Sequence, residues 1–285
     1  MSSSVAPMRT LDGKVVVITG AASGIGRAFA LEVGGRGALV AVSDVDDAGL
    51  AETVARVEVA GVREIRSASV DVADRAAVAA YAAEVAEHFG RVNVIVNNAG
   101  VSVSGDVNEL SYEDLDWIVA INLWGVVHGT KEFLPHLIAS GDGHVVNLSS
   151  LFGLVSVPGQ SAYNATKYAV RGFSEALREE MLVAGHPVGV TVVHPGGIRT
   201  DIVRNSRVSG RQDKAATVKL FDEKLAKMTP ERAAQIIAKA VLTDQPRLLV
   251  GLDAHLLHHV ARLMGARYQD LFAAVSKRTL PPPRT

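Results

Sequence analysis

Three side chains of this sequence, a serine, a tyrosine and a lysine, have the types and spacing for proton-transfer chemistry. Tyr163 and Lys167 stand four residues apart in SAYNATK, and Ser150 precedes the tyrosine by thirteen residues. In a helix, the tyrosine and the lysine share one face, a single turn apart. An ammonium beside a phenol favours the phenolate, so Tyr163 could act as a general acid/base while Ser150 holds a carbonyl or alcohol oxygen. The alternative is an ordinary amphipathic helix pair, and the rest of the chain weighs against it.

A glycine-rich turn near the N-terminus supplies a second element of chemistry. The β-branched run KVVVITG at 14–20 suits a strand buried on both faces, and a helical stretch follows at about 25–36. Between them, Gly20, Gly24 and Gly26 stand in TGAASGIG, where backbone amides and a helix N-terminus can meet a pyrophosphate. The spacing differs from the common GxGxxG fingerprint. A tight turn without a ligand is the alternative, but its place after the first strand of an alternating chain favours phosphate binding.

Strands and helices alternate along most of the chain. The predicted strands lie at about 14–19, 37–43, 64–70, 92–96, 144–149, 188–193 and 247–251. The predicted helices lie at 25–36, 46–60, 74–89, 111–139, 161–184 and 230–243. Repeated βαβ units imply an α/β fold: a doubly wound, Rossmann-like parallel sheet of about seven strands with helices on both faces, in a single domain. Ligands of such a sheet bind at the carboxyl ends of its strands.

Three helix starts carry local signals. Asp74 is an expected N-cap, and Ser111 with Asp114 has the spacing of a capping pair. Thr229 followed by Pro230 predicts a helix that begins with proline in its first turn.

Composition limits the classes of partner. The 285 residues have a net charge of −1 and no basic stripe, which argues against nucleic acid as a partner. The chain has no cysteine, so disulfides, thiol catalysis and Cys-ligated zinc are excluded, and a cytoplasmic location is expected. No run of 18 apolar residues occurs, so no membrane span is expected.

The domain boundaries follow from the same survey. We expect a disordered lead-in at 1–11, one catalytic domain at 12–251, and a C-terminal helical extension and tail at 252–285. The polar, poorly periodic segment at about 199–228 leaves a strand end beside the expected site and is interpreted as a mobile substrate lid, with a plain surface connection as the alternative.

With these residues in place, the chain resembles the classical short-chain dehydrogenases/reductases. The motifs that carry the resemblance are TGAASGIG at 19–26, NNAG at 97–100, INLWG around Asn122, NLSS at 147–150, YNATK at 163–167 and HPGGIRT at 194–200. They are specific in combination. The resemblance covers residues 12–200 well and the C-terminal part only loosely.

The resemblance implies four catalytic residues. Tyr163 would be the acid/base, and Lys167 would lower the pKa of the tyrosine and bond the nicotinamide ribose. Ser150, rather than its neighbour Ser149, would orient the substrate oxygen. Asn122 would hold a water that continues the proton relay from Lys167. The alternative for Asn122 is a helix-interior asparagine satisfied by local hydrogen bonds.

The resemblance also implies a dinucleotide site. Residues 195–200 would pack on the nicotinamide, Asp71 and Val72 would flank the adenine, and Asn97 to Gly100 would support the central sheet and the adenosine ribose side. The implied cofactor-binding residues are Gly20, Ser23, Gly24, Ile25, Gly26, Asp44, Asp71, Val72, Asn98, Ala99, Gly100, Tyr163, Lys167, Pro195, Gly196, Ile198 and Thr200.

Asp44 favours NAD over NADP as the cofactor. It ends the second predicted strand about twenty residues after the glycine turn, where a carboxylate accepts hydrogen bonds from the ribose hydroxyls and repels a 2′-phosphate. The positions at which relatives bind that phosphate hold Ser23 and Val45, although Arg27 could attract a phosphate. A simple turn-former is the alternative for Asp44.

The predicted function is an NAD-dependent oxidoreductase that interconverts a secondary alcohol and a ketone. Residues expected at the mouth of the site are mostly apolar and favour a lipophilic substrate: Val101, Val103, Leu151, Phe152, Val155, Val157 and Pro158. Three alternatives are a catalytically silent NAD(H)-binding regulatory protein, a sugar-nucleotide epimerase or dehydratase, and a reductase of carrier-bound acyl chains. The intact Ser-Tyr-Lys set argues against the silent regulatory protein. The TGxxxGxG spacing argues against the epimerase or dehydratase, and Asp44 argues against the acyl-chain reductase.

Two further features remain open. The family's helices at 111–139 and 161–184 usually build a dimer face, so a homo-oligomer, commonly a homotetramer, is expected. The apolar stretch 248–275 could pack in the core, against a subunit, over the pocket or on a membrane surface. His255 and His259 lie one turn apart there, but without a third ligand no metal site is expected.

Overall fold

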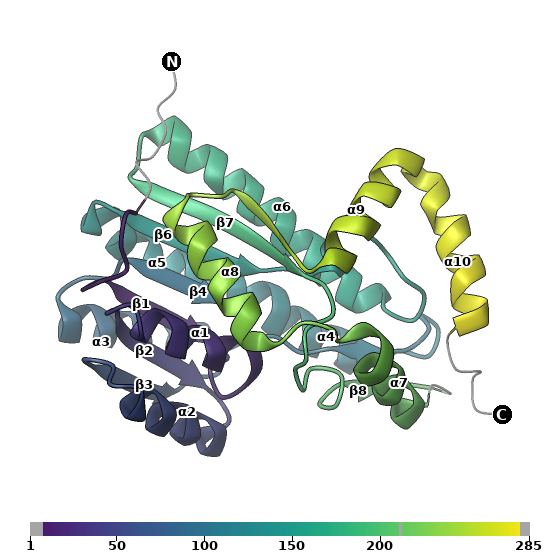
Figure 1. Cartoon of the computed structure of the whole chain (residues 1–285), viewed down its shortest axis with the longest axis horizontal. Coiled ribbons are helices and arrows are strands. Elements are labelled where there is room, and N and C mark those ends of the chain that lie inside the picture. The colour runs from purple at the N-terminus through teal and green to yellow at the C-terminus, as the bar shows by residue number, and fades with distance from the viewer. Residues whose placement is uncertain (1–7, 211–212, 280–285) are drawn as a thin grey trace.

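A seven-stranded parallel sheet forms the centre of the molecule (Figure 1). The computed structural model describes residues 8–210 and 213–279. The strands of the sheet run in the spatial order β3-β2-β1-β4-β6-β7-β9. Their bounds are β1 Val15–Thr19, β2 Leu39–Asp44, β3 Ile65–Ser69, β4 Val94–Asn97, β6 Gly143–Leu148, β7 Val188–Pro195 and β9 Arg247–Val250. The predicted doubly wound fold is therefore confirmed.

The direction of winding reverses between β1 and β4. Val16 of β1 pairs with Val40 on one side and with Val94 on the other, so the first strand lies inside the sheet, next to the central strand β4. All residues of β1, β4 and β6 are buried, because helices cover both faces of these β-branched runs. In such sheets the crevice at the carboxyl ends of the strands flanking the reversal is the usual binding site.

Helices form a layer on each face of the sheet (Figure 1). The main helices are α1 Gly24–Gly34, α2 Asp47–Val59, α3 Arg75–Phe89, α4 Tyr112–Val119, α5 Gly125–Ser140, α6 Ser161–Ala184 and α8 Pro230–Leu242. On one face, Phe29 of α1 and Ile237 of α8 are fully buried in one core cluster. On the other, Phe133 and Leu137 of α5 are buried in a second cluster. Full burial of side chains this large stabilises the fold by about 1.5–3 kcal/mol each.

The predicted helix starts are formed by their capping side chains. Asp74 accepts hydrogen bonds from the N–H groups of Ala76 and Ala77. Ser111 accepts one from the Asp114 N–H at 3.1 Å. Thr229 caps α8 in the same way, with Pro230 as its first residue. These local signals set the helix ends that position the sheet connections.

The helix expected at 111–139 is interrupted. Five residues in π-helical geometry, η1 Ala120–Trp124, separate α4 from α5. Asn122 is fully buried within η1, and its amide side chain bonds the Val101 backbone. A π turn of this kind is common where a helix presents a side chain to a site.

The chain is packed earlier than the predicted boundary at residue 12. Met8 and Leu11 have exposed fractions of 5% and 2% and belong to the core cluster of α1 and α8. Residues 1–7 of the predicted lead-in and residues 280–285 at the end of the predicted tail lie outside the described residues.

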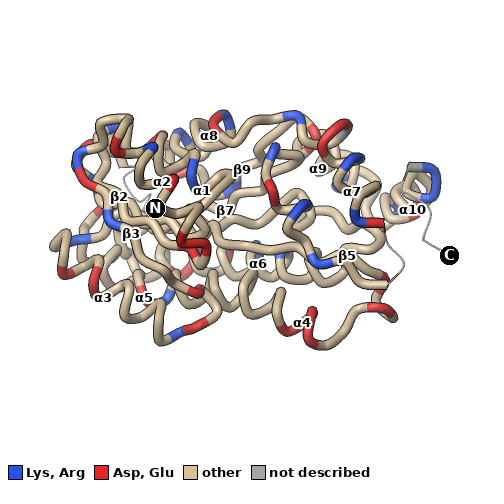
Figure 2. The backbone as a smooth tube through the Cα atoms, turned by 90° about the horizontal axis from the view of Figure 1, so that it is seen from below, with Lys and Arg blue, Asp and Glu red and all other residues tan. Residues whose placement is uncertain are grey.

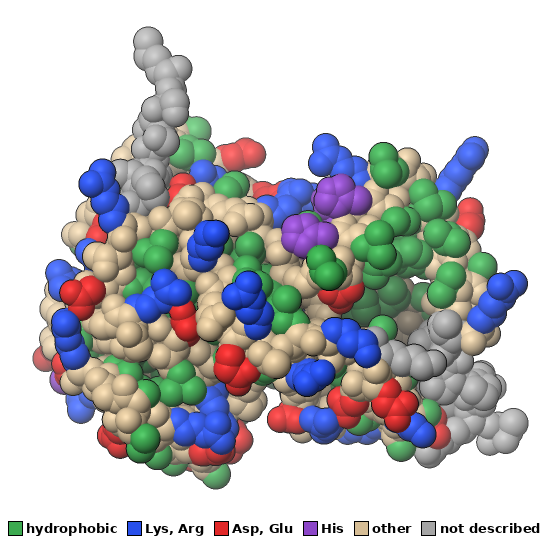
Figure 3. Space-filling model, viewed as in Figure 1, with side chains coloured by type: hydrophobic (Ala, Val, Ile, Leu, Met, Phe, Trp, Pro, Cys, Tyr) green, Lys and Arg blue, Asp and Glu red, His purple; other side chains and the backbone are tan. Residues whose placement is uncertain are grey.

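Beyond β9 the chain forms a helical hairpin. Its two helices, α9 Leu252–Met264 and α10 Tyr268–Thr279, stand beside the main body (Figure 1). Hydrophobic side chains gather over this hairpin on the face shown in Figure 3. Leu256, Leu263, Leu271 and Val275 are among its exposed apolar residues. Elsewhere acidic and basic residues are interspersed along the described chain (Figure 2).

Candidate active site

Ser150, Tyr163 and Lys167 meet at the carboxyl end of β6. Ser150 follows the strand, while Tyr163 and Lys167 lie on the first two turns of α6. The Ser150 side chain lies near enough to the Tyr163 phenol to influence its pKa, and the Lys167 Nζ lies 5.6 Å from the centre of the tyrosine ring. The lysine ammonium donates to the Leu148 carbonyl oxygen at 2.9 Å. Residues spaced thirteen and four apart in the sequence therefore converge in one cluster.

Burial dominates the electrostatics of this cluster. Tyr163 and Lys167 have exposed fractions of 9% and 3%. Burial raises the pKa of Tyr163 to about 12, although the Ser150 side chain acts in the opposite direction. Burial also lowers the pKa of Lys167 to about 8. In the protein alone the loss of solvation dominates the pKa of both groups, and the effect of the lysine charge on the phenol stays a prediction.

Asn122 reaches the same cluster from η1. Its Oδ1 accepts a hydrogen bond from the Val101 N–H at 2.8 Å, and its Nδ2 donates to the Val101 carbonyl at 2.9 Å. A Cβ added to Gly100 would lie 3.3 Å from the Asn122 Oδ1 and 3.4 Å from the Lys167 Nζ. The absence of a side chain at Gly100 thus lets the strand end, the asparagine and the lysine approach one another.

The glycine turn is joined tightly to the end of β4. Asn98 donates through its Nδ2 to the carbonyl oxygens of Thr19 and Gly20, at 2.9 and 2.8 Å. Gly20 has a φ of +66°, and a Cβ at this position would lie 2.6 Å from the Cα of Ala99. Both the conformation and the space require glycine here. Two motifs that lie about eighty residues apart in the sequence consequently form one surface.

The turn leads into a helix N-terminus without a side-chain cap. Ser23 precedes α1 and makes no capping hydrogen bond, and the first turn of α1 holds no acidic residue. Ile25 packs against the core cluster of α1. Such an N-terminus suits an anionic group, because its amides and its dipole both favour negative charge.

Asp44 faces this turn from the end of β2. Its carboxylate accepts hydrogen bonds from the N–H groups of Ala22 at 2.9 Å and Val45 at 2.8 Å. Arg27, which might have drawn a phosphate here, is engaged within the fold: it donates to Thr53 at 2.9 Å and pairs with Glu52 at 3.0 Å. The guanidinium also donates to the Ala22 carbonyl oxygen of the turn, so its donors are engaged within the fold between the turn and α2.

Asp71 and Val72 lie in the loop after β3. The Asp71 carboxylate accepts a hydrogen bond from the Ala73 N–H at 2.9 Å and is exposed. Val72 is buried, and its side chain occupies the space that a Cβ at Gly125 would need. This loop is therefore packed on the start of α5 at the same edge of the sheet.

The residues after β7 form the opposite side of the crevice. Pro195 ends the strand, and the Gly196 N–H donates to the Val250 carbonyl at 2.9 Å. Ile198 is buried in the core cluster of α1 and α8. A Cβ added to Gly24 would lie 3.1 Å from the Cγ2 of Thr200. Thr200 thus meets the glycine turn across the crevice.

His194, the first residue of the HPGGIRT motif, packs against Ser150. Its Nδ1 donates to the Ser150 carbonyl oxygen at 2.8 Å, and its ring is fully buried. Burial lowers the pKa of His194 to about 4, so the ring is neutral at pH 7. The histidine therefore holds the backbone of Ser150 without bringing a charge to the cluster.

The segment predicted as a lid contains short regular elements. Its strand β8 Arg207–Val208 pairs in parallel with β5 Val103–Ser104, and α7 Lys214–Leu220 follows. The Arg207 guanidinium stacks 3.9 Å over the Trp117 ring and pairs with Asp114 at 3.1 Å. These contacts hold the segment against α4.

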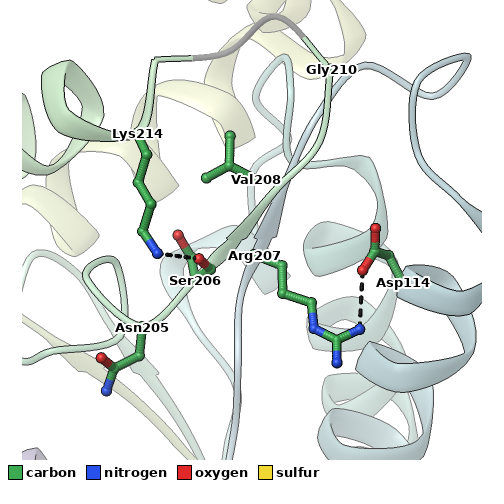
Figure 4. A pocket seen from close by; sticks show the side chains of 7 residues that line it. All are labelled: Asp114, Asn205, Ser206, Arg207, Val208, Gly210 and Lys214. Atoms are coloured by element: carbon green, nitrogen blue, oxygen red, sulfur yellow. Dashed lines mark hydrogen bonds and ion pairs between the residues drawn. The ribbon is translucent and has the colours of Figure 1, made fainter.

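Part of this segment and Asp114 line an open cavity of about 820 Å³ (Figure 4). The Arg207–Asp114 pair lies on one side of it and the Lys214 side chain on the other. The cavity is lined by Asp114, Asn205, Ser206, Arg207, Val208, Gly210 and Lys214. Ser150, Tyr163 and Lys167 do not line it, so it is separate from the catalytic cluster.

Two further expectations from the sequence concern metal binding and membrane spanning. Within residues 8–210 and 213–279, no group of three or more His, Asp or Glu side chains is placed to hold a metal ion. The His259 ring bonds the His255 carbonyl of its own helix at 2.7 Å. None of the helices in these residues has the length and apolarity to cross a membrane.

The fold and this cluster define a doubly wound α/β protein with a half-buried serine and a buried tyrosine and lysine beside a glycine-rich turn. The family described as "short chain dehydrogenase" matches residues 14–209, and the chain belongs to this family. It is an oxidoreductase of that family.

Individual relatives agree with this assignment. A Mycobacterium tuberculosis protein named "Putative oxidoreductase SadH" is 53% identical over 267 residues, which cover 94% of this chain and 96% of the relative. A crystal structure of a short chain dehydrogenase/reductase from Burkholderia phymatum in complex with NAD has a TM-score of 0.81 and 31% identity, and the match covers 98% of this chain and 100% of that chain. The structure of levodione reductase has a TM-score of 0.75 and 29% identity, with 86% and 99% covered.

Proposed function

We propose that this protein is an NAD-dependent oxidoreductase that interconverts a secondary alcohol and a ketone, with Tyr163 as the general acid/base. The observation that carries the proposal is the cluster of the half-buried Ser150 with the buried Tyr163 and Lys167 at the carboxyl ends of the strands. A phenol, a hydroxyl and an ammonium in one dry site can move a proton to or from a carbonyl oxygen.

The residues around the crevice fit NAD. An uncapped helix N-terminus at Ser23 suits the pyrophosphate, and Asp44 suits a ribose with free hydroxyls. Asp71, Val72 and Asn98 to Gly100 would lie along the adenosine half, and Pro195, Gly196, Ile198 and Thr200 along the nicotinamide half. When bound, NAD would supply the hydride acceptor and, when reduced, the donor. The NAD complex of the Burkholderia phymatum relative supports this choice.

The proton chemistry would be carried by this chain's own side chains. With a pKa of about 12, the Tyr163 phenol holds its proton at pH 7 and can donate it to an oxygen that gains charge during ketone reduction. Ser150 would donate a hydrogen bond to the same oxygen. Lys167 would return a proton to the tyrosine, and Asn122 would hold a water that connects this relay to solvent. In alcohol oxidation the proton moves in the opposite direction.

The surroundings of Tyr163 support a lipophilic substrate. The Phe152 ring stands edge-on to the Tyr163 ring, with centroids 6.1 Å apart. Val103 and Ile118 are buried beside the tyrosine, and Leu151 and Val155 are buried just beyond Ser150. Such walls favour apolar carbon around the reacting carbonyl over a polyhydroxylated sugar.

Two larger-scale features belong to the same proposal. Residues 199–228 would act as a lid that opens for the substrate and closes to exclude water. The protein would work as a homo-oligomer, built on the face of α4, η1 and α6, where Tyr112, Trp124 and Val183 are exposed by 85%, 51% and 90%. We also propose a cytoplasmic location, with which a chain lacking cysteine is compatible.

The first experiment is oxidation of NADH and NADPH, followed optically, against a panel of lipophilic ketones and polar sugars. Tyr163→Phe is the control, because it removes only the proton-transfer group. We expect turnover of lipophilic ketones with NADH, and at least a hundredfold loss in the variant with nearly unchanged NADH binding. Full activity of the variant would refute the role of Tyr163. NADH binding without turnover of any compound would favour a nicotinamide-sensing protein.

A further inference from the structure

The helix α9 places a carboxylate directly against the turn that follows β7. The Asp253 Oδ2 accepts a hydrogen bond from the Gly197 N–H at 2.7 Å, although the two residues are 56 positions apart. Asp253 lies in the first turn of α9, where the helix dipole stabilises a negative charge. The N-terminus of α9 therefore stabilises the charge of the Asp253 carboxylate, and the same carboxylate is hydrogen-bonded to the turn after β7.

The Asp253 carboxylate is closely packed against Gly196 and Gly251. A Cβ added to Gly196 would collide with the Asp253 carboxylate, and so would one added to Gly251. The Gly196 N–H is fixed in addition by the Val250 carbonyl at 2.9 Å. Two consecutive N–H groups of the turn are thus bonded to the segment that begins the C-terminal hairpin.

The hairpin that carries Asp253 is itself anchored beside Ser150. The Tyr268 hydroxyl, on α10, accepts a hydrogen bond from the Ser156 N–H at 3.0 Å. Ala254 is fully buried with Leu151 and Val155, which follow Ser150 in the chain. Because these contacts hold α9 in place, Asp253 cannot withdraw from the turn without disrupting the wall beyond Ser150.

We propose that Asp253 is a positioning residue, which fixes the Pro195–Gly197 turn at the depth that the nicotinamide half of the cofactor requires. This inference rests on the proposed function. Asp253 does not touch the reacting atoms; it acts through the turn. The C-terminal hairpin is thereby part of the catalytic unit, because it supports both the turn and the segment after Ser150. Misplacement of a reacting group by about 1 Å can cost a hundredfold in rate.

The test compares Asp253→Ala with Asp253→Asn. The asparagine oxygen can still accept the Gly197 hydrogen bond, whereas alanine cannot. The control is Asp270→Ala, because Asp270 is an exposed acid in the first turn of α10 and has a similar relation to its helix dipole. We expect Asp253→Ala to exchange the Gly197 amide hydrogen at least tenfold faster, to raise the Kd of NADH several-fold and to lower kcat about tenfold. Asp253→Asn should recover most of each loss.

The outcomes separate the positioning role from a merely structural one. If Asp253→Ala lowers only the unfolding midpoint, as Asp270→Ala does, and keeps the Kd of NADH and kcat of the wild type, the inference is wrong. Equal losses in the alanine and asparagine variants would also overturn it, because the hydrogen bond would then not matter. Failure of the wild-type protein to bind NADH would instead contradict the proposed function.

Discussion

Asp44 shows how one carboxylate can select a cofactor through its surroundings. It accepts hydrogen bonds from the Ala22 N–H of the glycine turn and from the Val45 N–H that follows β2, and the nearby cation Arg27 is held by Glu52 and Thr53. The arginine is thus paired within the fold, and the Asp44 carboxylate lies beside the turn. A 2′-phosphate placed beside this carboxylate would meet repulsion, which is the basis of the NAD preference that we propose.

Asp44→Asn should narrow that preference. The amide keeps an acceptor for the turn but loses the charge, so the ratio of kcat/KM for NADH over NADPH should fall about tenfold, equivalent to about 1.4 kcal/mol. The control is Asp47→Asn, an exposed acid on the first turn of α2. Steady-state kinetics with both cofactors measures the ratio. An unchanged ratio in Asp44→Asn would place the carboxylate away from the ribose.

Lys167 should make stability depend on pH. Its pKa is about 8 in the folded protein and 10.5 in the unfolded reference. Below pH 8 both states carry the proton, and the fold bears the full cost of burying the charge. Between pH 8 and 10.5 the unfolded chain binds more protons, so the free energy of unfolding rises with pH.

Lys167→Met removes this titration and keeps the apolar stem. The variant should therefore be more stable than the wild type at pH 7, by about 1–3 kcal/mol after the loss of the Leu148 hydrogen bond. The difference should shrink as the pH rises to about 10. Urea unfolding at pH 7 and pH 10 measures this difference in the free energy of unfolding. Both proteins contain Tyr163, so the titration of the tyrosine contributes equally to each and does not affect the difference. A difference that stayed constant with pH would contradict the buried ammonium.

At the scale of elements, the glycine turn joins β1, β4 and α1 into one surface. Gly20 and Gly61 both have left-handed φ values, +66° and +76°. A Cβ at Gly20 would lie 2.6 Å from the Ala99 Cα, whereas a Cβ at Gly61 would meet nothing within 4 Å. Alanine substitutions at Gly20 and Gly61 therefore separate the free-energy cost of the left-handed conformation from that of the steric clash.

Gly61→Ala should therefore destabilise the protein by about 1 kcal/mol, from conformation alone. Gly20→Ala should cost a further 1–3 kcal/mol or so from overpacking, and should weaken NADH binding as well. Thermal unfolding and fluorescence titration with NADH measure the two effects. Equal destabilisation by both substitutions would mean that Ala99 can move away from the turn.

The segment 199–228, which the sequence predicts as a lid, is held by contacts with residues far away in the sequence. Arg207 stacks on Trp117 and pairs with Asp114, which lie about ninety residues earlier. Its strand donates the Ser209 N–H to the Ser104 carbonyl at 2.8 Å. A half-exposed stacked guanidinium of this kind contributes about 0.5–2 kcal/mol.

Arg207→Ala should open this segment more often. We expect the Ser209 amide hydrogen to exchange about tenfold faster, as hydrogen–deuterium exchange can measure. Arg204→Ala is the control, because the ion pairs of Arg204 with Asp201 and Asp222 lie within the same segment. Equal exchange in the two variants would show that the stack on Trp117 does not hold the lid.

At the scale of the whole molecule, two sets of exposed apolar residues bear on assembly. One lies on the hairpin of α9 and α10, and the other on α4, η1 and α6, where Tyr112, Trp124 and Val183 are exposed. The second set coincides with the helices proposed for subunit contact. Large aromatic side chains at the centre of an interface contribute most to its affinity.

Light scattering should give a mass two or four times the 30.0 kDa of the chain. Trp124→Glu should shift the protein towards the monomer, since it would bury a charge in the interface. Val59→Glu is the matched control, because Val59 is 90% exposed on α2, away from these helices. A monomeric wild type, or an unchanged mass in Trp124→Glu, would contradict the proposed interface.

The sequence by itself determined the strands of the central sheet and most of the helices, and predicted the residues of the candidate site, because its signals are local. The period of the apolar residues sets the strands and helices, a capping side chain such as Asp74 reaches only two or three residues ahead, and the Tyr163–Lys167 pair is a single helical turn. These features need no knowledge of the chain path.

Tertiary structure alone decided the features that depend on distant segments. The pKa of Tyr163 follows burial rather than the nearby charge, and the π turn at Asn122 accompanies its bonds to Val101. Asp253 reaches Gly197 only because β9 lies beside β7. Burial and contact between remote residues depend on how the chain returns on itself, and no periodicity or spacing within a segment encodes that path.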